Sequence, residues 1–212
     1  MNIEQVIILG CGGHARSVAD VALTNNIKIL MFLDEKADAS ETLFDVPVKK
    51  TLTTDLNSAA INYFVALGDS KSRAAKIQWL SQNNLSLTSI ISKTASIGIE
   101  SNISRGCFIG HHAHVGPKTQ ILDGCIINTA AIVEHDCLIG KYTHISVNAT
   151  VAGQVSIGDH CFIGAGATII NNIKICSHVI IGANSVVIKD INQPGTYVGN
   201  PARLVHENIT CV

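Results

Sequence analysis

The sequence predicts a small α/β domain followed by a parallel β-solenoid, and three observations carry this prediction. The first eighty residues or so alternate between short apolar runs and segments with helical spacing. From Ile91 to Val187 an aliphatic side chain returns at every sixth position. Of the 212 residues, 47% are hydrophobic, but only 15% are charged and 4% are aromatic. We expect a Rossmann-like domain over residues 1–82, the solenoid over residues 83–195 and a C-terminal tail over residues 196–212.

The N-terminal segment alternates between predicted strands and predicted helices. Apolar runs that end at glycine or acidic residues are typical of the buried strands of a parallel sheet, and the segments between them show helical spacing. The expected strands are 5–10, 27–33 and 62–67, and the expected helices are 16–23 and 72–82.

A glycine-rich turn follows the first predicted strand. Gly10-x-Gly12-x-x-Ala15 nearly matches the dinucleotide-binding fingerprint, and Asp34 follows about twenty residues later. Glycines let backbone N–H groups approach a phosphate at a helix N-terminus, and Asp34 can accept hydrogen bonds from a ribose or a base. The alternative is a tight βα turn without a ligand, with Asp34 as an ordinary loop acid.

The size of this domain and His14 both disfavour a dehydrogenase. About eighty residues form only half of a dinucleotide-binding fold, so a mononucleotide-linked ligand suits the domain better than NAD. His14 follows the double glycine and is not part of the dinucleotide fingerprint, and hydride transfer has no use for an imidazole at this position. Reduction with NADH would be excluded if NADH does not bind.

The repeat covers seventeen consecutive positions spaced by six, and each is Ile or Val. Four residues after each lies a small or β-branched side chain. This period fits neither a helix nor a simple alternating strand, but it fits a coil of three short strands with the aliphatic residue pointing inward. An 18-residue coil gives five to six coils and a prism roughly 25–30 Å tall. A glycine often follows the inward residue, as at Gly98 and Gly110, and we expect it to turn the corner.

Cysteine content, charge and hydropathy exclude several classes of protein. The seven cysteines form no C-x-x-C pair, which indicates reduced thiols in a cytoplasmic protein. A net charge of −1 attracts neither nucleic acid nor an anionic membrane, and we expect no transmembrane helix and no signal peptide. Four cysteines occupy the small inward position of the repeat and are predicted to be buried hydrophobic residues: Cys107, Cys125, Cys137 and Cys161.

One histidine of the repeat stands out from the aliphatic pattern. Glu134-His135-Asp136 interrupts the stretch between Val133 and Cys137. An imidazole beside a carboxylate is typical of a general base, because the carboxylate holds the tautomer while the other nitrogen takes a proton. Such a base must be neutral, so activity is expected to fall below about pH 6. The alternative is an exposed histidine on a solvated edge, the interpretation that we favour for the other histidines of the repeat.

The remaining histidines also raise the question of zinc. His111, His112 and His114 lie close together in the sequence, as the ligands of a zinc enzyme would. Neighbouring strand residues face opposite sides, however, and the spacing does not repeat from coil to coil. We therefore expect no metal site.

The repeat resembles that of the left-handed parallel β-helix, whose members are mostly acyltransferases and trimers. The whole chain resembles the sialic acid O-acetyltransferase/bacillosamine N-acetyltransferase family of sugar acyltransferases. Two departures concern Arg16, where the family often has Lys, and Asp136, where the bacillosamine enzymes have Glu. The stretches that carry the resemblance are Gly10 to Arg16, Phe32 to Lys36, Asn128 to Cys137 and Gly199 to Arg203.

This resemblance implies a reaction and a set of site residues. The implied enzyme transfers an acetyl group directly from acetyl-CoA to the 4-amino group of a nucleotide-linked 4-amino-4,6-dideoxy sugar, with UDP as the expected carrier. His135 is the implied catalytic base and Asp136 its orienting carboxylate. The implied cofactor-binding residues are Asn128, His144, Gly153, Ala165 and Ala183, with the Gly153 N–H on the oxyanion. The implied sugar-nucleotide residues are Gly12, Gly13, His14, Asp34, Glu35, Lys36 and Gly68.

The implied assembly is a homotrimer with its active sites between protomers, and two other functions stay open. The same residues could O-acetylate a sialic-acid-type sugar, although a free sialic acid needs no nucleotide pocket. A non-catalytic trimeric scaffold would need no His135–Asp136 pair and would not bind acetyl-CoA.

Overall fold

The computed structural model describes residues 4–38, 40–51 and 61–207. It divides into two compact units, residues 1–92 and 93–212. This boundary lies ten residues beyond the expected one because the segment after residue 82 still belongs to the first unit. There β6 (Ser86–Leu87) pairs with β5 (Asn62–Val65), and β7 (Ile90–Ile91) lies against helix α1 (Gly13–Thr24). At the other end, β24 (Gly195–Val198) and β25 (Arg203–Glu207) continue the second unit, so part of the expected tail is folded.

The first unit is a parallel sheet with the strand order β3-β4-β2-β1-β5-β6. β1 (Gln5–Leu9) lies between β2 (Lys28–Leu33) and β5, and both pairings are parallel. β4 (Val46–Lys49) extends the sheet beyond β2, and β3 (Thr42–Leu43) pairs with it in the antiparallel direction. The apolar runs of the sequence form the three central strands, as predicted, whereas the short edge strands were not expected.

Two helices complete this unit. Helix α1 buries its small and branched face, including Ala15, Val18 and Ala22, as its spacing predicted. Helix α2 (Ser70–Gln82) begins after Asp69, whose side chain accepts a hydrogen bond of 2.8 Å from the Ser72 amide. No described helix has the length and hydropathy needed to cross a membrane.

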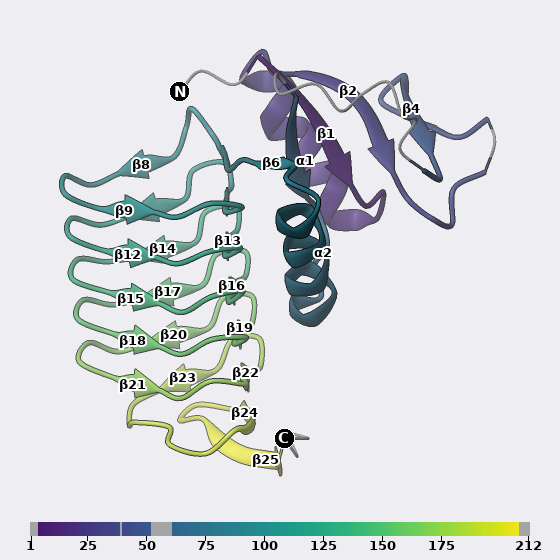
Figure 1. The fold of residues 1–212 in the computed structure, drawn as a ribbon. Coiled ribbons are helices and arrows are strands. Elements are labelled where there is room, and N and C mark those ends of the chain that lie inside the picture. Colours follow the sequence, from purple (N-terminus) through teal and green to yellow (C-terminus); the bar gives the residue numbers. More distant parts are fainter. Residues whose placement is uncertain (1–3, 39, 52–60, 208–212) are drawn as a thin grey trace. The chain divides into compact units, whose positions relative to one another are not determined.

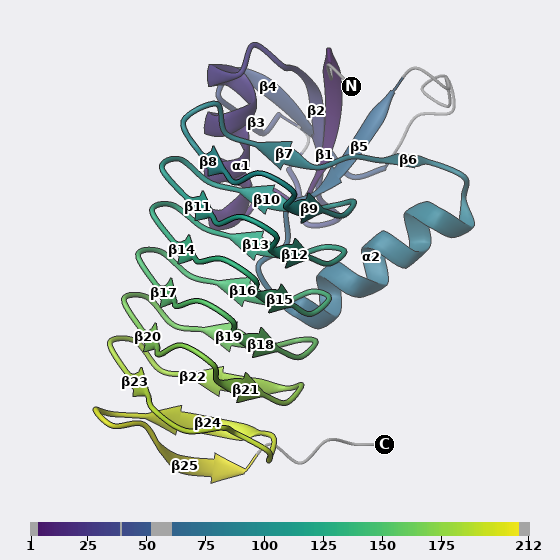
Figure 2. The ribbon, with the colours of Figure 1, turned by 90° about the vertical axis from the view of Figure 1, so that its left-hand side faces the viewer.

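The second unit is a parallel β-helix with three strands in each coil (Figures 1 and 2), which confirms the predicted fold class. Through residue 187, strands that are 18 residues apart pair in parallel, so Val115 lies over Val133 and Val133 over Val151, whereas β25 pairs with β24 in the antiparallel direction. From Ile109 onward the residues of the six-residue repeat are buried, as are those four positions later.

The strands of this unit form three sheets. The first sheet contains β10 (Phe108–Ile109), β13 (Ile126–Ile127), β16 (His144–Ile145), β19 (Phe162–Ile163) and β22 (Val179–Ile181), followed by β24 and β25. The second sheet contains β8 (Ser96–Ile97), β11 (His114–Val115), β14 (Ile132–Val133), β17 (Thr150–Val151), β20 (Thr168–Ile169) and β23 (Val186–Val187). The third contains β9 (Asn102–Ile103), β12 (Gln120–Ile121), β15 (Leu138–Ile139), β18 (Ser156–Ile157) and β21 (Lys174–Ile175).

The corners of the coils are not turned by the expected glycine. The left-handed residue of each corner lies three positions after the inward aliphatic residue, and it is usually not glycine: Asp136 has φ 56° and His160 also has φ 56°. The glycine directly after the aliphatic residue has another role. A Cβ on Gly116 would lie 2.6 Å from the backbone of Glu134, so glycine is needed there for the close approach of the next coil.

The four predicted inward cysteines are buried free thiols. Each thiol donates a hydrogen bond to the carbonyl oxygen fifteen residues later, as Cys125 does to Gly140 at 2.9 Å. Burial raises the pKa of Cys161 to about 12 and also raises that of Cys137. All four thiols therefore bridge successive coils, and Cys137 and Cys161 are poor nucleophiles.

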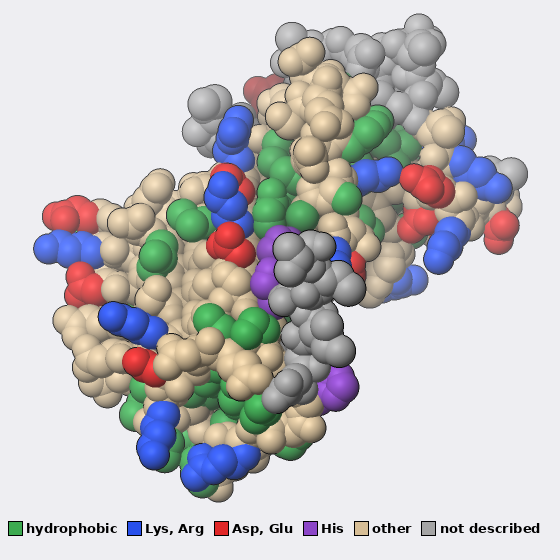
Figure 3. Space-filling view, turned by 60° about the horizontal axis from the view of Figure 1, so that its bottom comes forward, with side chains coloured by type: hydrophobic (Ala, Val, Ile, Leu, Met, Phe, Trp, Pro, Cys, Tyr) green, Lys and Arg blue, Asp and Glu red, His purple; other side chains and the backbone are tan. Residues whose placement is uncertain are grey.

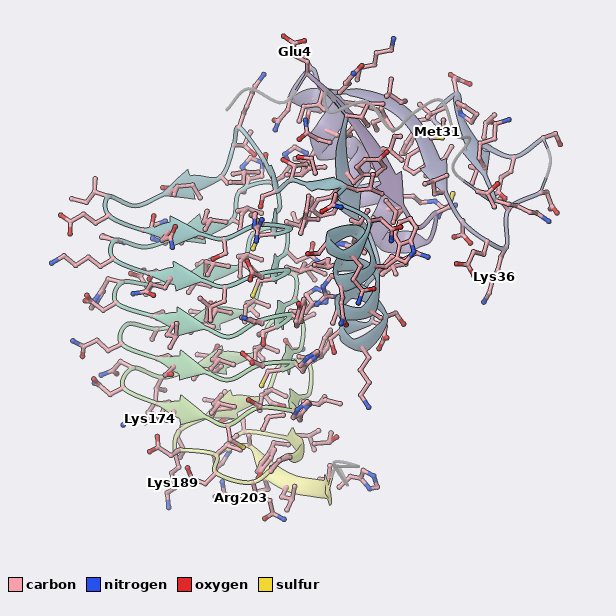
Figure 4. The ribbon with its side chains drawn as sticks, viewed as in Figure 1. Glu4, Met31, Lys36, Lys174, Lys189 and Arg203 are labelled. Carbon is pink, nitrogen blue, oxygen red and sulfur yellow. The ribbon has the colours of Figure 1, made fainter. Side chains whose placement is uncertain are left out.

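The three edges of the prism differ in character, and we number them after the sheet that each follows. The third edge carries charged side chains, and its aromatic rings stack from coil to coil, with 5.0 Å between the centroids of Tyr142 and His160 and 5.3 Å between those of His160 and His178. On the third sheet, Lys174 extends away from the ribbon (Figure 4). The residue two positions after each inward residue marks an edge. On the first edge these residues are His111, Thr129, Val147, Ala165 and Ala183, and on the second they are Pro117, His135, Gly153, Asn171 and Lys189. On the third edge they are Arg105, Asp123, Lys141, Asp159 and Ser177.

Charges of both signs are interspersed on the face drawn in Figure 3. This distribution agrees with the net charge of −1.

Candidate active site

His135 and Asp136 form a hydrogen-bonded pair on the second edge. His135 Nδ1 lies 2.8 Å from Asp136 Oδ2, and the two side chains are 52% and 46% exposed. Asp136 occupies the left-handed position of the corner, a conformation that aspartate tolerates better than most residues. The carboxylate holds one ring nitrogen, so Nε2 is the nitrogen that faces possible reactants.

Gly153 lies directly against the His135 ring, one coil further along the same edge. A Cβ at residue 153 would lie 2.5 Å from His135 Nε2, so only glycine leaves room for the ring in this position. The Gly153 N–H has no hydrogen-bond partner among the residues that the structure describes. The His135 ring nitrogen and the backbone of Gly153 are thus neighbours, and a proton-transfer site with oxyanion stabilisation requires a ring nitrogen close to a backbone donor.

Thr119 fixes the corner that carries this pair. Its buried hydroxyl donates to the carbonyl oxygen of Glu134 at 2.6 Å and accepts from the Cys137 amide at 3.1 Å. These two hydrogen bonds hold the backbone directly before His135 and directly after Asp136. Sequence reasoning missed Thr119, because its contact with the corner depends on the stacking of the coils.

Asn128 and His144 meet near the first edge. Asn128 Nδ2 lies 3.2 Å from His144 Nε2, and Asn128 Oδ1 accepts a 2.8 Å hydrogen bond from the Thr129 amide. The His144 ring packs edge-on against Phe162, with centroids 5.1 Å apart. Ala165 and Ala183 lie on the same edge in successive coils, so the predicted cofactor residues other than Gly153 gather along this edge.

A single chain does not bring the two groups of residues together. His135, Asp136 and Gly153 lie on the second edge, and the second sheet separates them from Asn128 on the first edge. A span of about six extended residues corresponds to roughly 15–20 Å, which exceeds the reach of a single reaction centre.

The first unit contains a cavity of about 980 Å³ at the carboxyl ends of its central strands. Three of the predicted residues line the cavity, and they directly follow β2: Asp34, Glu35 and Lys36. Figure 4 labels Lys36. Gly12, Gly13, His14 and Gly68 are not among its lining residues. The full lining is Leu9, Gly10, Leu33, Asp34, Glu35, Lys36, Lys50, Thr51, Leu67, Ser72, Ala75, Lys76 and Trp79.

Several lining residues were not predicted from the sequence. Lys50 and Thr51 come from the segment after β4, and Ser72, Lys76 and Trp79 come from α2. No motif marks these side chains. The spacing of the α2 residues by three and four positions was the one available signal for a shared helix face.

Asp34 organises the loops around the cavity. Its Oδ2 accepts a 3.0 Å hydrogen bond from the Cys11 amide, and its Oδ1 accepts one of 3.0 Å from the Lys36 amide. Asp34 therefore links the glycine-rich turn to the loop after β2. Gly12 and Gly13 are exposed, and α1 begins there without a side-chain cap.

His14 is held beside a buried arginine. Desolvation, together with the neighbouring Arg73 guanidinium, lowers the pKa of His14 to about 4. Arg73 is fully buried and donates 2.8 Å hydrogen bonds to the carbonyl oxygens of Leu67 and Gly68. His14 is thus neutral at physiological pH, and Gly68 belongs to the loop that Arg73 fixes.

The described residues contain no group of three or more His, Cys, Asp or Glu side chains that could hold a metal ion. His111 instead lies 3.2 Å from Thr94 through Nδ1, and the same threonine hydroxyl accepts the His112 amide.

Two family models match the chain, one in each unit. Residues 5–80 match the PglD N-terminal domain, and residues 130–171 and 154–189 match the bacterial transferase hexapeptide (six repeats). The chain matches no curated protein sequence.

Solved structures agree with this assignment over nearly the whole chain. The acetyltransferase domain of PglB from Neisseria gonorrhoeae FA1090 is 29% identical with a TM-score of 0.86, covering 95% of this chain and 100% of that one. It has also been solved in complex with acetyl coenzyme A. A His-to-Ala mutant of GDP-perosamine N-acetyltransferase from Caulobacter crescentus, in complex with CoA and GDP-perosamine, is 27% identical with a TM-score of 0.89, covering 97% of this chain and 99% of that one.

The fold and the two matched regions define a hexapeptide-repeat transferase with an added N-terminal α/β domain. The chain carries a PglD N-terminal domain followed by bacterial transferase hexapeptide repeats, and over nearly its whole length it is similar to sugar acetyltransferases.

Proposed function

We propose that this protein is an acetyl-CoA-dependent N-acetyltransferase acting on the 4-amino group of a nucleotide-linked 4-amino-4,6-dideoxy sugar. The observation that carries the proposal is the His135–Asp136 pair, with the ring of His135 against Gly153. Similar proteins support the reaction class, since the PglB domain binds acetyl coenzyme A and the Caulobacter enzyme binds CoA and GDP-perosamine.

In the proposed mechanism, the sugar amine attacks the thioester carbonyl of acetyl-CoA while His135 Nε2 takes the amine proton. The C–N bond forms and the C–S bond breaks, and the proton passes from His135 to the sulfur of CoA. Asp136 stabilises the imidazolium through Nδ1, and the Gly153 N–H stabilises the oxyanion. No acyl-enzyme is needed, and burial raises the pKa of Cys137, the cysteine nearest in sequence to His135.

The proposed assembly is a homotrimer with the active site between protomers. Asn128 and His144 of one protomer would face His135 of the next, and acetyl-CoA would run along Ala165 and Ala183. Exposed aliphatic side chains on the first two edges support this arrangement: Val147 is 42% exposed, Ile170 38% and Ile188 41%. We further propose that the protein acts in the cytoplasm, where acetyl-CoA is available.

The proposal also concerns which nucleotide carries the sugar. UDP is the carrier that the sequence resemblance implies, whereas the Caulobacter relative supports GDP as a second candidate. The nucleotide cavity of the first unit favours either carrier over a free sialic acid as substrate.

An acetyl-CoA consumption assay with UDP-, GDP-, dTDP- and CMP-linked amino sugars tests this function. We expect stoichiometric release of CoA with one carrier, and we expect His135→Asn to lower kcat at least about 10²-fold. His178→Asn is the matched control, since it removes an imidazole on the third edge. Near-normal turnover by His135→Asn would exclude the mechanism, and the absence of acetyl-CoA binding in calorimetry would favour an inert scaffold.

A further inference from the structure

One face of helix α2 is buried in the first unit, and another face lines its cavity. Arg73, Ile77 and Leu80 are buried and attach the helix to its own unit. Ala75 and Lys76 each lie three or four positions from both Ser72 and Trp79, so the four residues share another face, and all four line the 980 Å³ cavity.

Trp79 on this face is not among the buried residues of α2. It is 39% exposed and lines the cavity, while the opposite face of α2 supplies the core contacts. It is also the only tryptophan of the chain. A large planar ring at the wall of a cavity provides a stacking surface for another planar group.

The charges around Trp79 suit an anionic ligand. Lys76 Nζ lies 5.3 Å from the centroid of the Trp79 ring and 3.0 Å from Glu35 Oε1, so Glu35 is engaged in this ion pair. Asp34 accepts two backbone amides. The cations Lys36 and Lys50 complete the lining, where they can bind phosphate oxygens.

We propose that Trp79 stacks on the nucleobase of the sugar nucleotide, replacing the Lys76 ammonium on the ring face, while Lys36 and Lys50 bind the diphosphate. This inference rests on the proposed function, because it assigns the nucleotide half of the substrate to this cavity. Base stacking is tolerant of base identity, since every base offers a π face. Trp79 therefore supplies affinity for the nucleotide, and the choice between carriers comes from other contacts.

The single tryptophan makes a direct test possible. We expect saturable quenching of the intrinsic fluorescence on titration with UDP or GDP, and no quenching with inorganic pyrophosphate, which carries no base. Quenching by CoA that saturates in the same range would assign the cavity to the adenine of the cofactor and overturn the inference. Unchanged fluorescence with a nucleotide whose binding is seen by calorimetry would overturn it as well.

Steady-state kinetics with variants provides the second test. Trp79→Leu is expected to raise KM for the nucleotide-linked sugar about tenfold or more, while KM for acetyl-CoA and kcat stay within about twofold. Trp79→Phe should retain most of the affinity. Phe44→Leu is the control, since Phe44 is an aromatic residue that is 51% exposed and does not line the cavity.

The two proposals fail in different ways. An unchanged KM in Trp79→Leu, with acetyl transfer intact, would overturn the stacking role alone. The absence of acetyl transfer to any nucleotide-linked sugar would overturn the proposed function.

Discussion

Thr119 Oγ1 donates a hydrogen bond of 2.6 Å to the carbonyl oxygen of Glu134, the residue that precedes the proposed base. Thr143 makes the equivalent contact four corners further along the solenoid, on the third edge, donating to Gly158 at 2.8 Å and accepting from the Cys161 amide at 3.0 Å. The two threonines thus hold two corners in the same way, but only one corner carries the His135–Asp136 pair.

Thr119→Val and Thr143→Val form a matched pair for testing this relationship. Each should lower the free energy of unfolding by about 1–3 kcal/mol, because each leaves a buried carbonyl and amide unsatisfied. Only Thr119→Val should also lower kcat, because only this substitution removes hydrogen bonds from the corner that carries His135. Denaturant unfolding and turnover at saturating substrates measure the two effects, and an equal loss of kcat in both variants would contradict a local role.

Gly153→Ala is expected to separate activity from stability. The added Cβ would meet the His135 ring at 2.5 Å, and the ring is half-exposed and free to swing outward. The melting temperature should therefore change little, while kcat falls by about 10²-fold because the base is displaced. Asn171→Ala, one coil further along the same edge, is the control, and wild-type kcat in Gly153→Ala would show that the ring position does not matter.

Asp136→Asn tests the orienting carboxylate. Asparagine tolerates the left-handed conformation that Asp136 adopts at φ 56°, so the fold should be retained. The loss of the negative charge beside Nδ1 should lower kcat by about 10-fold or more and move the acidic limb of the pH–rate profile to lower pH. A profile identical to that of the wild type would mean that the carboxylate does not act on the imidazole.

His14 should make the stability of the protein depend on pH. Its pKa is about 4 in the folded chain, below the ordinary value for histidine, because of desolvation and Arg73. Between about pH 6.5 and pH 4 the unfolded chain takes up a proton that the folded chain does not. The free energy of unfolding therefore decreases as the pH is lowered through this window.

We expect this loss to reach about 2 kcal/mol at pH 5 relative to pH 7.5. The loss should be absent in His14→Gln and retained in His206→Gln, which changes an exposed histidine. Urea unfolding at the two pH values measures it, and the same pH dependence in all three proteins would show that His14 is not responsible.

The oligomeric state tests the proposed packing of the first two edges. Ile170→Asp and Ile188→Asp place a charge among exposed aliphatic residues on the second edge and should convert a trimer to monomers with little residual activity. Leu138→Asp is the control, because Leu138 is 40% exposed but lies on the third sheet. Light scattering gives the mass, and monomers in the wild type would remove the basis for a shared site.

The solenoid was predictable because its period appears directly in the sequence: a residue such as Val133 contacts those 18 positions before and after it. The coil length of 18 residues also predicted that Gly153 lies next to His135, because the two positions are 18 residues apart. The left-handed corner residue was missed because several residue types adopt that conformation, and the glycine two positions before it is required by the close approach of the next coil. The cavity was predicted only in part, since Lys50 and Trp79 meet Asp34 through folding of distant segments that share no motif.

The stacking of coils at one strand spacing also sets a length scale for the reaction. Each 18-residue coil advances the edges by about 4.8 Å, so the number of coils beyond His135 determines how long a pantetheine arm the prism can accompany. In the proposed mechanism, insertion or deletion of a whole coil past Gly153 would change this length in fixed increments, while the corner that carries His135 stays intact.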